Sequence, residues 1–335
     1  MRPTFTLQLV NPPFGDPGLH VDFLFEKRAL LFDLGDIRAL PPRKLLRISH
    51  VFVSHTHMDH FFGFDWLLRI SLGRAHTIEL FGPPGILAQV EAKLSAYTWN
   101  LVHNYAGNFT LVVGEWHADG RLERARFACR ERFRREPLPP AHCPDGLLVE
   151  QKNFRVRAAF LDHEVPVLGF ALDEPRHVNL WKNRLQDMGL QVGPWLQGLK
   201  QAVLAGAKDD TPIHAQWKSE GRTVERTLAL ADLKPAITIV PGNRIAYVTD
   251  VVHHAENVQR IVTLARDADV LFIEAVFLDA DAEHAARKFH LTAKQAGSIA
   301  CTAGARQVIP FHFSPRYTGR EAELRLELAQ AFRGG

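Results

Sequence analysis

Residues 54–60 read Ser-His-Thr-His-Met-Asp-His, and this stretch says most about what the chain can do. Four of its side chains, those of His55, His57, Asp59 and His60, are of the kinds that bind first-row metal ions. A turn between a strand and a helix can aim several such groups at one point, whereas alternate side chains of a straight strand leave opposite faces. The stretch therefore predicts a metal site on a turn.

The residues on either side support a strand-to-helix turn. Residues 48–54 contain the run Val51, Phe52 and Val53, which favours a buried strand, and apolar residues recur at helical spacing over 61–70. Burying four unpaired polar groups at such a junction would be costly. We therefore favour metal binding over the alternative that these three histidines and the aspartate have no functional role.

The composition is that of a globular protein with an ample core. Of the 335 residues, 46% are hydrophobic and 23% are charged, and the formal net charge is +3. This mild positive charge permits a polyanionic partner without demanding one. Three widely spaced cysteines form neither a paired zinc motif nor a disulfide framework, which favours the reducing cytoplasm. Residues 1–10 do not resemble a signal peptide, and no apolar run reaches the length of a membrane span.

Strands and helices alternate in both halves of the chain, around a middle part, residues 109–160, that alternates in strand fashion. We expect further strands at 5–10, 21–25, 29–32, 78–81, 236–240, 244–249, 270–275 and 307–311, and helices at 255–265, 292–303 and 320–332. Residues 174–234 differ, because glycine and proline punctuate a segment rich in lysine, arginine and tryptophan. We expect one domain over residues 1–335, with 174–234 as an arm inserted within it.

Three more candidate ligands, His163, Asp250 and His312, each follow an apolar strand. Polar groups placed directly after strands gather at one edge of a sheet. Taken singly, each has a plain alternative, because an aspartate after a strand is often a helix cap and a histidine there is often a loop residue.

The spacing His-x-His-x-Asp-His resembles the signature of the metallo-β-lactamase superfamily. Later blocks resemble one branch of it, ribonuclease Z, the endonuclease family that trims the 3′ end of tRNA precursors. In the family's order, the blocks are His163-Glu164-Val165-Pro166 with Gly169-Phe170, Tyr247-Val248-Thr249-Asp250, Glu274-Ala275-Val276-Phe277, His290-Leu291-Thr292-Ala293 through Gly297, and His312-Phe313-Ser314-Pro315-Arg316-Tyr317. The blocks that begin at His290 and His312 point to the ribonuclease Z branch.

The resemblance implies an α+β fold, the four-layer αβ/βα sandwich, with a site for two divalent metal ions. The implied ligands are His55, His57 and His163 for one ion, Asp59, His60 and His312 for the other, and Asp250 as a bridge between them. Zinc is the expected metal, and histidine and aspartate ligands also suit manganese or iron.

The resemblance also implies a mechanism. A hydroxide activated by the two metal ions would attack the phosphodiester, and Asp59 could orient or deprotonate the water. His290, paired with Glu274, would protonate the leaving oxygen. Two alternatives stay open: His290 could instead cap the helix that begins near Thr292, and Arg316 could face the phosphate or form a structural salt bridge.

Three features concern the substrate. Residues 9–16 lack the Leu-Gly-Thr/Ser pattern that is usual in the first loop of the family. Within the arm, residues 193–200 resemble the Gly-Pro segment with which the family's arm grips tRNA. A basic run over residues 121–135 could serve nucleic acid through counterion release, or it could be a solvated surface.

The leading interpretation is therefore a cytoplasmic, metal-dependent endoribonuclease that acts on tRNA 3′ ends, and the resemblance suggests a homodimer. The enzyme alternative is a small-molecule or cyclic-nucleotide phosphodiesterase, or another hydrolase with this fold, which the changed first loop favours. A non-enzymatic metal-binding scaffold is disfavoured, because the chain carries all seven candidate ligands as well as Glu274 and His290.

Overall fold

The computed structural model describes residues 4–219 and 221–334, so the first three residues of the expected N-terminal segment lie outside it. The chain divides into two compact units. The larger unit combines Met1–Asp173 with Arg244–Gly335, and the smaller one is Glu174–Asn243. None of the helices in the described ranges is both long and apolar enough to cross a membrane.

The first sheet of the larger unit has eight strands in sequence order. They are β1 (Phe5–Leu9), β2 (Leu19–Phe23), β3 (Ala29–Phe32), β4 (Ile48–Phe52), β5 (Thr77–Gly82), β6 (Thr110–Trp116), β7 (Arg121–Ala128) and β8 (Arg135–His142). Strands β3 to β6 are parallel neighbours, and the pairs on either side of them are antiparallel. The parallel strands need crossover connections, which short helices and loops supply.

The second sheet has six strands, and its parallel part supplies several site residues. Its spatial order is β18 (Val308–Phe311), β17 (Val270–Glu274), β16 (Arg244–Val248), β11 (Pro166–Asp173), β10 (Arg155–Asp162) and β9 (Leu147–Glu150). Strands β16, β17 and β18 run parallel, so the loops after them leave from the same edge.

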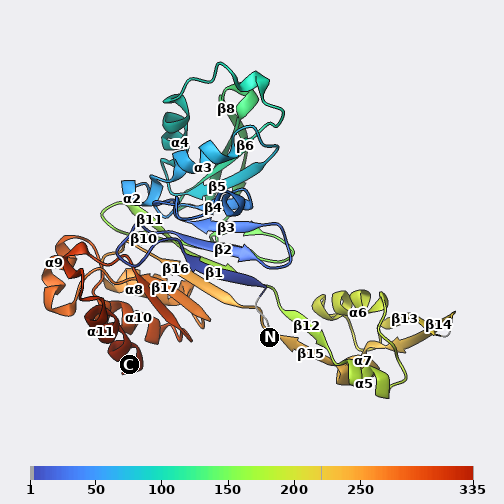
Figure 1. The fold of residues 1–335 in the computed structure, drawn as a ribbon. Helices are drawn as coiled ribbons and strands as arrows, with labels where there is room; N and C mark the ends of the chain where they lie inside the picture. Colours follow the sequence, from blue (N-terminus) through green and yellow to red (C-terminus); the bar gives the residue numbers. More distant parts are fainter. Residues whose placement is uncertain (1–3, 220, 335) are drawn as a thin grey trace. The chain divides into compact units, whose positions relative to one another are not determined.

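The two sheets pack face to face, and helices cover both outer faces (Figure 1). Aromatic rings fill the space between the sheets: Phe32 of β3 lies 5.7 Å from Phe170 of β11 and 5.8 Å from Tyr247 of β16, centroid to centroid. The covering helices are α3 (Phe64–Ser71) and α4 (Ile86–Ser95) on one side, and α8 (Ala255–Leu264), α10 (Ala293–Thr302) and α11 (Glu321–Arg333) on the other. The predicted four-layer αβ/βα sandwich is confirmed.

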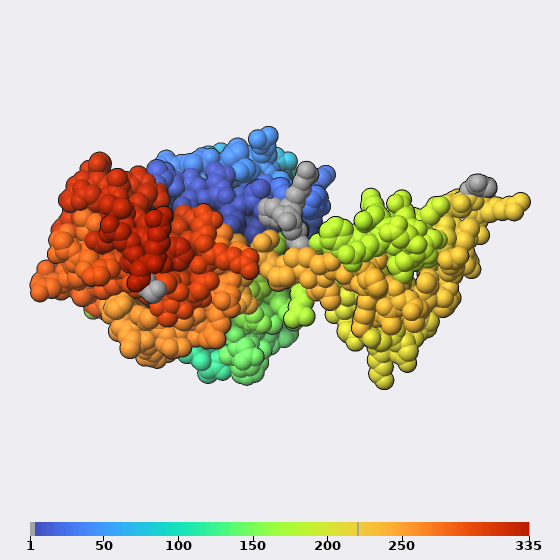
Figure 2. Space-filling model, turned by 90° about the horizontal axis from the view of Figure 1, so that it is seen from below, coloured from blue at the N-terminus to red at the C-terminus, as the bar shows by residue number. Residues whose placement is uncertain are grey.

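N-terminal and C-terminal parts of the larger unit meet on one face, where Figure 2 shows blue and red atoms side by side. The Phe313 amide donates to the carbonyl of Pro13 at 2.7 Å, and the Phe14 and Phe313 rings lie 5.5 Å apart. Helices α10 and α11 also approach closely, because a Cβ atom added to Gly297 would lie 2.4 Å from the carbonyl oxygen of Leu328. Glycine allows this contact between the two helices.

The prediction of one continuous helix after the histidine turn was wrong. The expected helix at 61–70 is two helices, α2 (Met58–Phe61) and α3, separated near Gly63. The Gly63 amide donates to the carbonyl of Leu34 at 2.7 Å, and a Cβ atom there would lie 2.2 Å from the carbonyl oxygen of Gly35. This tertiary contact redirects the chain after the histidine turn. Two further short helices, α1 (Pro42–Leu45) and α9 (Ala282–Arg287), complete the α-helices of the larger unit in the described residues.

The smaller unit has a hydrophobic core of its own, centred on Trp195, Leu199 and Trp217. Two antiparallel strand pairs and three helices surround this core: β12 (His177–Leu180) with β15 (Ile237–Val240), β13 (Pro212–Ser219) with β14 (Arg222–Ala229), α5 (Lys182–Asp187), α6 (Trp195–Leu204) and α7 (Leu230–Leu233). The expected arm, 174–234, falls within this unit.

Candidate metal centre and active site

The seven predicted ligands lie in the segments that directly follow strands of the two packed sheets. The histidine turn follows β4, His163 follows β10, Asp250 follows β16 and His312 follows β18. Asp59 and His60 lie in the short helix α2, which begins directly after His57. Loops from both sheets therefore approach one place from opposite sides.

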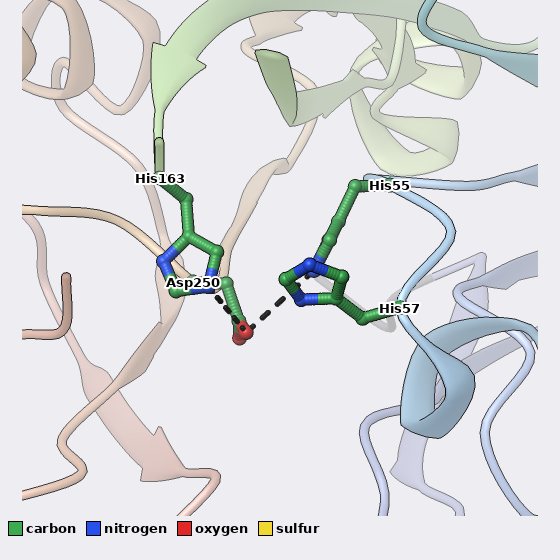
Figure 3. Close-up of side chains that lie close together, drawn as sticks. All are labelled: His55, His57, His163 and Asp250. Carbon is green, nitrogen blue, oxygen red and sulfur yellow. Dashed lines mark ion pairs between the residues drawn. The ribbon is translucent and has the colours of Figure 1, made fainter. Parts of the chain in front are cut away.

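The first group of side chains is His55, His57, His163 and Asp250, whose ligand atoms all lie within 4.8 Å of one another. Figure 3 shows the three imidazoles directed toward the carboxylate of Asp250. The distances to Asp250 Oδ2 are 3.7 Å from His55 Nε2 and 3.5 Å from His163 Nε2. These are the residues that the family resemblance assigned to one metal ion and to the bridge.

The second group is Asp59, His60 and His312, again with ligand atoms within 4.8 Å of one another. It faces the other oxygen of Asp250, which lies 3.3 Å from His60 Nε2 and 2.9 Å from His312 Nδ1. His312 Nε2 lies 3.3 Å from Asp59 Oδ2. The structure thus brings all seven predicted ligands together, with Asp250 between the two groups.

Several of these nitrogen atoms have no hydrogen-bond partner although they are buried, among them His55 Nε2, His60 Nε2 and His312 Nδ1. A buried polar atom without a partner costs free energy. Each of the three faces the Asp250 carboxylate at ion-pair distance. A divalent cation bound among nitrogen and oxygen ligands would satisfy all three, so the residues fit a site for divalent metal ions.

Burial and charge act on the two buried histidines of the turn in opposite ways. Burial, together with the neighbouring imidazoles of His60, His57 and His163, lowers the pKa of His55 to about 2 despite the opposing Asp250 carboxylate. His55 is therefore neutral, as a metal ligand must be. Burial also opposes charge on His60, but the carboxylates of Asp250 and Asp33 outweigh it and raise the pKa of His60 to about 10. These carboxylates attract a positive charge, which a metal ion would supply in place of the proton.

Hydrogen bonds to the other ring nitrogen fix the orientation of two ligands. His60 Nδ1 lies 3.0 Å from Asp33 Oδ2, and His163 Nδ1 lies 2.7 Å from the carbonyl oxygen of Phe289. Each Nδ1–H donates to its oxygen, so Nε2 faces the site.

The aspartate that orients His60 was missed in the sequence. Asp33 is fully buried and also accepts hydrogen bonds from the Ser54 amide at 2.7 Å and the Tyr247 hydroxyl at 2.9 Å. The available signal was a carboxylate directly after the apolar run Ala29–Phe32.

The Glu274 carboxylate and the His290 imidazole form a second functional unit beside the ligands. Glu274 Oε2 lies 2.9 Å from His290 Nδ1, and Oε1 accepts hydrogen bonds from the Val251 and Leu291 amides at 3.0 Å each. Burial opposes charge on Glu274, but the interaction with His290 prevails and lowers the pKa of Glu274 to about 2. Burial likewise opposes charge on His290, and the Glu274 carboxylate raises its pKa. The pair therefore holds a proton on the imidazole.

Two of the structural alternatives are excluded. Helix α10 is capped by Thr292, whose side chain accepts from the Gln295 amide in a capping box, so His290 is not the cap. Helix α8 is capped by the side chain of His254, so Asp250 is not a cap either.

Arg316 lies apart from the ligand groups. Its Nη1 atom is 3.5 Å from Asp281 Oδ1, and its guanidinium lies 5.8 Å from the ring centroid of Phe277. It nevertheless lines a cavity of about 330 Å³ together with His290 and His312. Arg316 thus forms a salt bridge and also faces the cavity. Both alternatives for Arg316, a structural salt bridge and contact with the phosphate, therefore stay open.

The backbone is strained around the site. Among the described residues, eight other than glycine have positive φ, and three of them, Asp33 at 58°, Asp250 at 44° and His312 at 59°, carry functional side chains. Two more are site neighbours, Glu164 and Phe289. Side chains in this region cost free energy, so the packing around the site must hold them there.

Comparison with known proteins agrees with this geometry. Residues 130–313 match the family model described as "Beta-lactamase superfamily domain". The solved structure of the short form of human tRNase Z covers 93% of each chain with a TM-score of 0.52 at 19% identity. The metallo-β-lactamase fold protein YhfI from Bacillus subtilis covers 98% of this chain and 92% of its own, with a TM-score of 0.55 at 13% identity. Fold and site thus define a metallo-hydrolase of the β-lactamase superfamily.

Curated relatives identify the branch of this superfamily. The ribonuclease Z of Deinococcus radiodurans is 32% identical over 307 residues, covering 90% of this chain and 87% of the relative. The chain belongs to the ribonuclease Z family. The ribonuclease Z of a Picosynechococcus species is 31% identical over 319 residues, covering 90% and 81%. The chain is accordingly a metal-dependent hydrolase of the endoribonuclease class.

Proposed function

We propose that the chain cleaves precursor tRNA at its 3′ end with the help of two divalent metal ions, with zinc as the preferred metal. The observation that carries this proposal is the convergence of two ligand groups on opposite oxygens of Asp250, with the Glu274–His290 pair beside them. The ribonuclease Z relatives support an RNA substrate.

In this proposal each group of ligands holds one ion. His55, His57 and His163 would hold the first, Asp59, His60 and His312 the second, and Asp250 would bridge them. When bound, two such ions lower the pKa of water and neutralise charge on the phosphate.

Asp59 is placed to orient the attacking water. Burial opposes its charge, but the hydrogen bond with His312 and the charges of His60 and His312 lower the pKa of Asp59 to about 2. An ionised carboxylate accepts hydrogen bonds only, and this one is partly exposed, so it can accept one from water.

His290 is placed to protonate the leaving oxygen. Its Nδ1 faces Glu274, which leaves Nε2 as the proton donor, and its side chain lines the cavity beside His312. A positioned acid of this kind contributes about 10²- to 10⁴-fold to a rate. Glu274 acts through His290 by keeping it protonated and fixed in orientation.

Part of the basic run over 121–135 is neutralised by neighbouring carboxylates, because three of its seven arginines form ion pairs. Arg126 pairs with Glu131 and Glu136, and Arg135 pairs with Glu91. Paired arginines release fewer counterions on binding a polyanion. We therefore favour a solvated surface for this run, and we keep RNA contact by residues 174–234, a homodimer and a cytoplasmic location as further parts of the proposal.

A second candidate substrate is a small phosphodiester, because the first loop departs from the family pattern at the site itself. Asp16 Oδ2 accepts a hydrogen bond from the Asp36 amide at 3.0 Å, and the Pro13 carbonyl accepts one from Phe313, next to the ligand His312. A loop tied down in this way shapes what can reach the metal centre.

The test is hydrolysis by the zinc-loaded protein of three substrates: a precursor tRNA, bis(p-nitrophenyl) phosphate and a cyclic nucleotide. We expect precursor tRNA to be cut at its 3′ side. Intact precursor tRNA beside a cleaved small diester would reject the proposal in favour of the second candidate. The variant His55→Ala should lose about 10²-fold in activity through lost metal, whereas His103→Ala, at an exposed histidine that belongs to none of the ligand groups, should keep full activity.

A further inference from the structure

A further group of potential metal ligands lies outside the active site, on the hairpin of β6 and β7. Glu115 and Glu123 are directly opposite each other in the strand register, and His117 is two residues beyond Glu115. Because side chains two apart on a strand share a face, all three lie on the same side of the hairpin. Their ligand atoms are all within 4.8 Å of one another, and they share no residue with the active site.

This side of the hairpin is covered by helix α4. Glu115 has the same parity along β6 as Leu111 and Val113, which belong to the core under the helices, whereas Trp116 belongs to the core between the sheets. The Leu87 amide, in the first turn of α4, donates to Glu115 Oε2 at 3.1 Å. One oxygen of Glu115 is thus used by the helix, and the other is turned toward His117.

The buried charge of Glu115 is not balanced by a lysine or arginine in the described residues. Like charges directly opposite on neighbouring strands are destabilising, and Glu115 is only 9% exposed. Arg121 pairs with Glu123 from the solvent side, but within the described residues no lysine or arginine pairs with Glu115. Among the described residues, His117 is the basic side chain at ion-pair distance from Glu115, so the Glu115 carboxylate has room for a further positive charge.

The imidazole itself lacks a partner. His117 Nε2 lies 3.3 Å from Glu115 Oε1 and 3.9 Å from Glu123 Oε1, yet this nitrogen is buried and makes no hydrogen bond. A nitrogen and two carboxylate oxygens directed at one point form a ligand set for zinc or manganese.

We propose that Glu115, His117 and Glu123 bind a divalent metal ion, with zinc as the best fit, at a site separate from the active site. Zinc bonds of about 2.0–2.1 Å in tetrahedral geometry place neighbouring ligand atoms about 3.3–3.4 Å apart, and the His117–Glu115 pair already has this spacing. Glu123 closes the remaining gap by rotation of its partly exposed side chain, which exchanges its ion pair with the exposed Arg121 for a bond to the metal. Water takes the fourth position.

Such an ion would fasten the end of the hairpin to the start of α4, because Glu115 contacts both the ion and the helix. A ligand that binds the folded state alone stabilises it by mass action. The site would therefore show itself as bound metal and as a gain in thermal stability with zinc, and hydrolysis of a phosphodiester would not depend on it.

The experiment measures zinc per chain on the full protein after stripping with chelator, reloading in a zinc-buffered solution and gel filtration. We expect His117→Ala and Glu123→Gln each to hold one zinc fewer than the unsubstituted chain, with unchanged hydrolysis of bis(p-nitrophenyl) phosphate. The matched controls His142→Ala and Glu136→Gln, at exposed positions on β8, should keep the full zinc content. The difference between chains does not depend on how many ions the active site holds.

Equal zinc in the unsubstituted chain and in Glu123→Gln would overturn the proposal, and so would an equal loss in the controls. Should His117→Ala fail to fold, Glu123→Gln decides the matter, since its side chain is partly exposed at a strand end. Zinc should also raise the Tm of the unsubstituted chain more than that of Glu123→Gln. If zinc raised the Tm of both chains equally, the proposal would be wrong, and His117 would stabilise the two glutamates without a metal ion.

Discussion

Oε2 of Glu274 lies 2.9 Å from Nδ1 of His290, while Oε1 of the same buried carboxylate accepts the amides of Val251 and Leu291. Glu274 therefore joins three parts of the site: its own strand, the loop that carries Asp250 and the loop that carries His290. Moving the proton donor relative to the metal ligands would mean breaking these bonds.

Replacing this carboxylate should impair proton transfer while the metal stays bound. We expect Glu274→Gln to lower kcat on RNA by about 10- to 100-fold. His290 must be protonated to act as an acid, so activity falls as pH rises through its pKa. Because Glu274 raises that pKa, the alkaline limb should move to lower pH in the variant. The control is Glu327→Gln, since Glu327 also accepts two backbone amides but has no histidine partner. An unmoved pH limb would contradict the assignment.

The leaving group should decide how much His290→Ala matters. An RNA 3′ oxygen is a poor leaving group and needs a proton, whereas p-nitrophenolate leaves without one. We expect a loss of about 10²- to 10⁴-fold on RNA and a small loss on bis(p-nitrophenyl) phosphate. Rates on both substrates with one enzyme preparation provide the check. Equal losses would show that His290 has a structural role only.

Asp33 should affect zinc affinity indirectly, by orienting the ligand His60. Replacement by asparagine keeps the shape and tolerates the positive φ of 58° at this position, but it removes the charge that His60 Nδ1 faces. We expect Asp33→Asn to weaken zinc binding by about 10- to 100-fold, measured against a competing chelator. Asp267→Asn is a suitable control, because Asp267 has a similar φ of 54° on the surface. Similar zinc affinity in both variants would count against an orienting role.

His20 should make stability fall in acid. Both of its ring nitrogens are buried without partners, and burial, with Lys44 and Arg47, lowers its pKa from 6.5 to about 4. Between these values the unfolded chain binds the proton and the folded chain does not, so the contribution is intact above 6.5 and is lost as pH falls toward 4.

The variant His20→Leu should therefore gain about 2 kcal/mol relative to the unsubstituted chain on going from about pH 8 to about pH 5. Urea unfolding at the two pH values measures this difference. His103→Leu, at an exposed histidine, should show no such change. A difference in free energy that stays constant with pH would refute the assignment.

Two helical glycines should respond to alanine in opposite directions. A Cβ atom at Gly297 would lie 2.4 Å from the Leu328 carbonyl oxygen, so Gly297→Ala should cost about 1–3 kcal/mol by forcing α10 and α11 apart. Gly198 in α6 has no atom within 4 Å of such a Cβ, so Gly198→Ala should stabilise by about 0.5–1 kcal/mol. Amide hydrogen exchange reports the free energy of opening for each helix separately. If both substitutions changed the free energy of opening in the same direction, the packing described for the two glycines would be contradicted.

The order of the main strands and the clustering of the seven candidate ligands could be predicted, because both depend on local patterns. Buried strands are apolar runs, and site residues of packed sheets follow the strand ends, as His163 and Asp250 do. That these seven side chains bind metal ions remains a prediction.

Other features depend on partners distant in the chain. Asp33 meets His60 only after β3 and β4 pair, and the break in the helix at Gly63 comes from contact with Leu34 and Gly35. Asp33 precedes His60 by 27 residues. The sequence pattern around either residue gives no indication that the two side chains make contact.

The split of the larger unit around Glu174–Asn243 has a consequence for the order of events during translation. The ribosome delivers His55 and His163 well before Asp250 and His312, and the smaller unit, with its own hydrophobic core, emerges between them. A nascent chain therefore carries five of the seven candidate ligands before Asp250 and His312 are made. The full ligand set is complete only after β18, the last strand of the second sheet in chain order, has been made. Metal-dependent hydrolysis therefore requires a nearly finished chain.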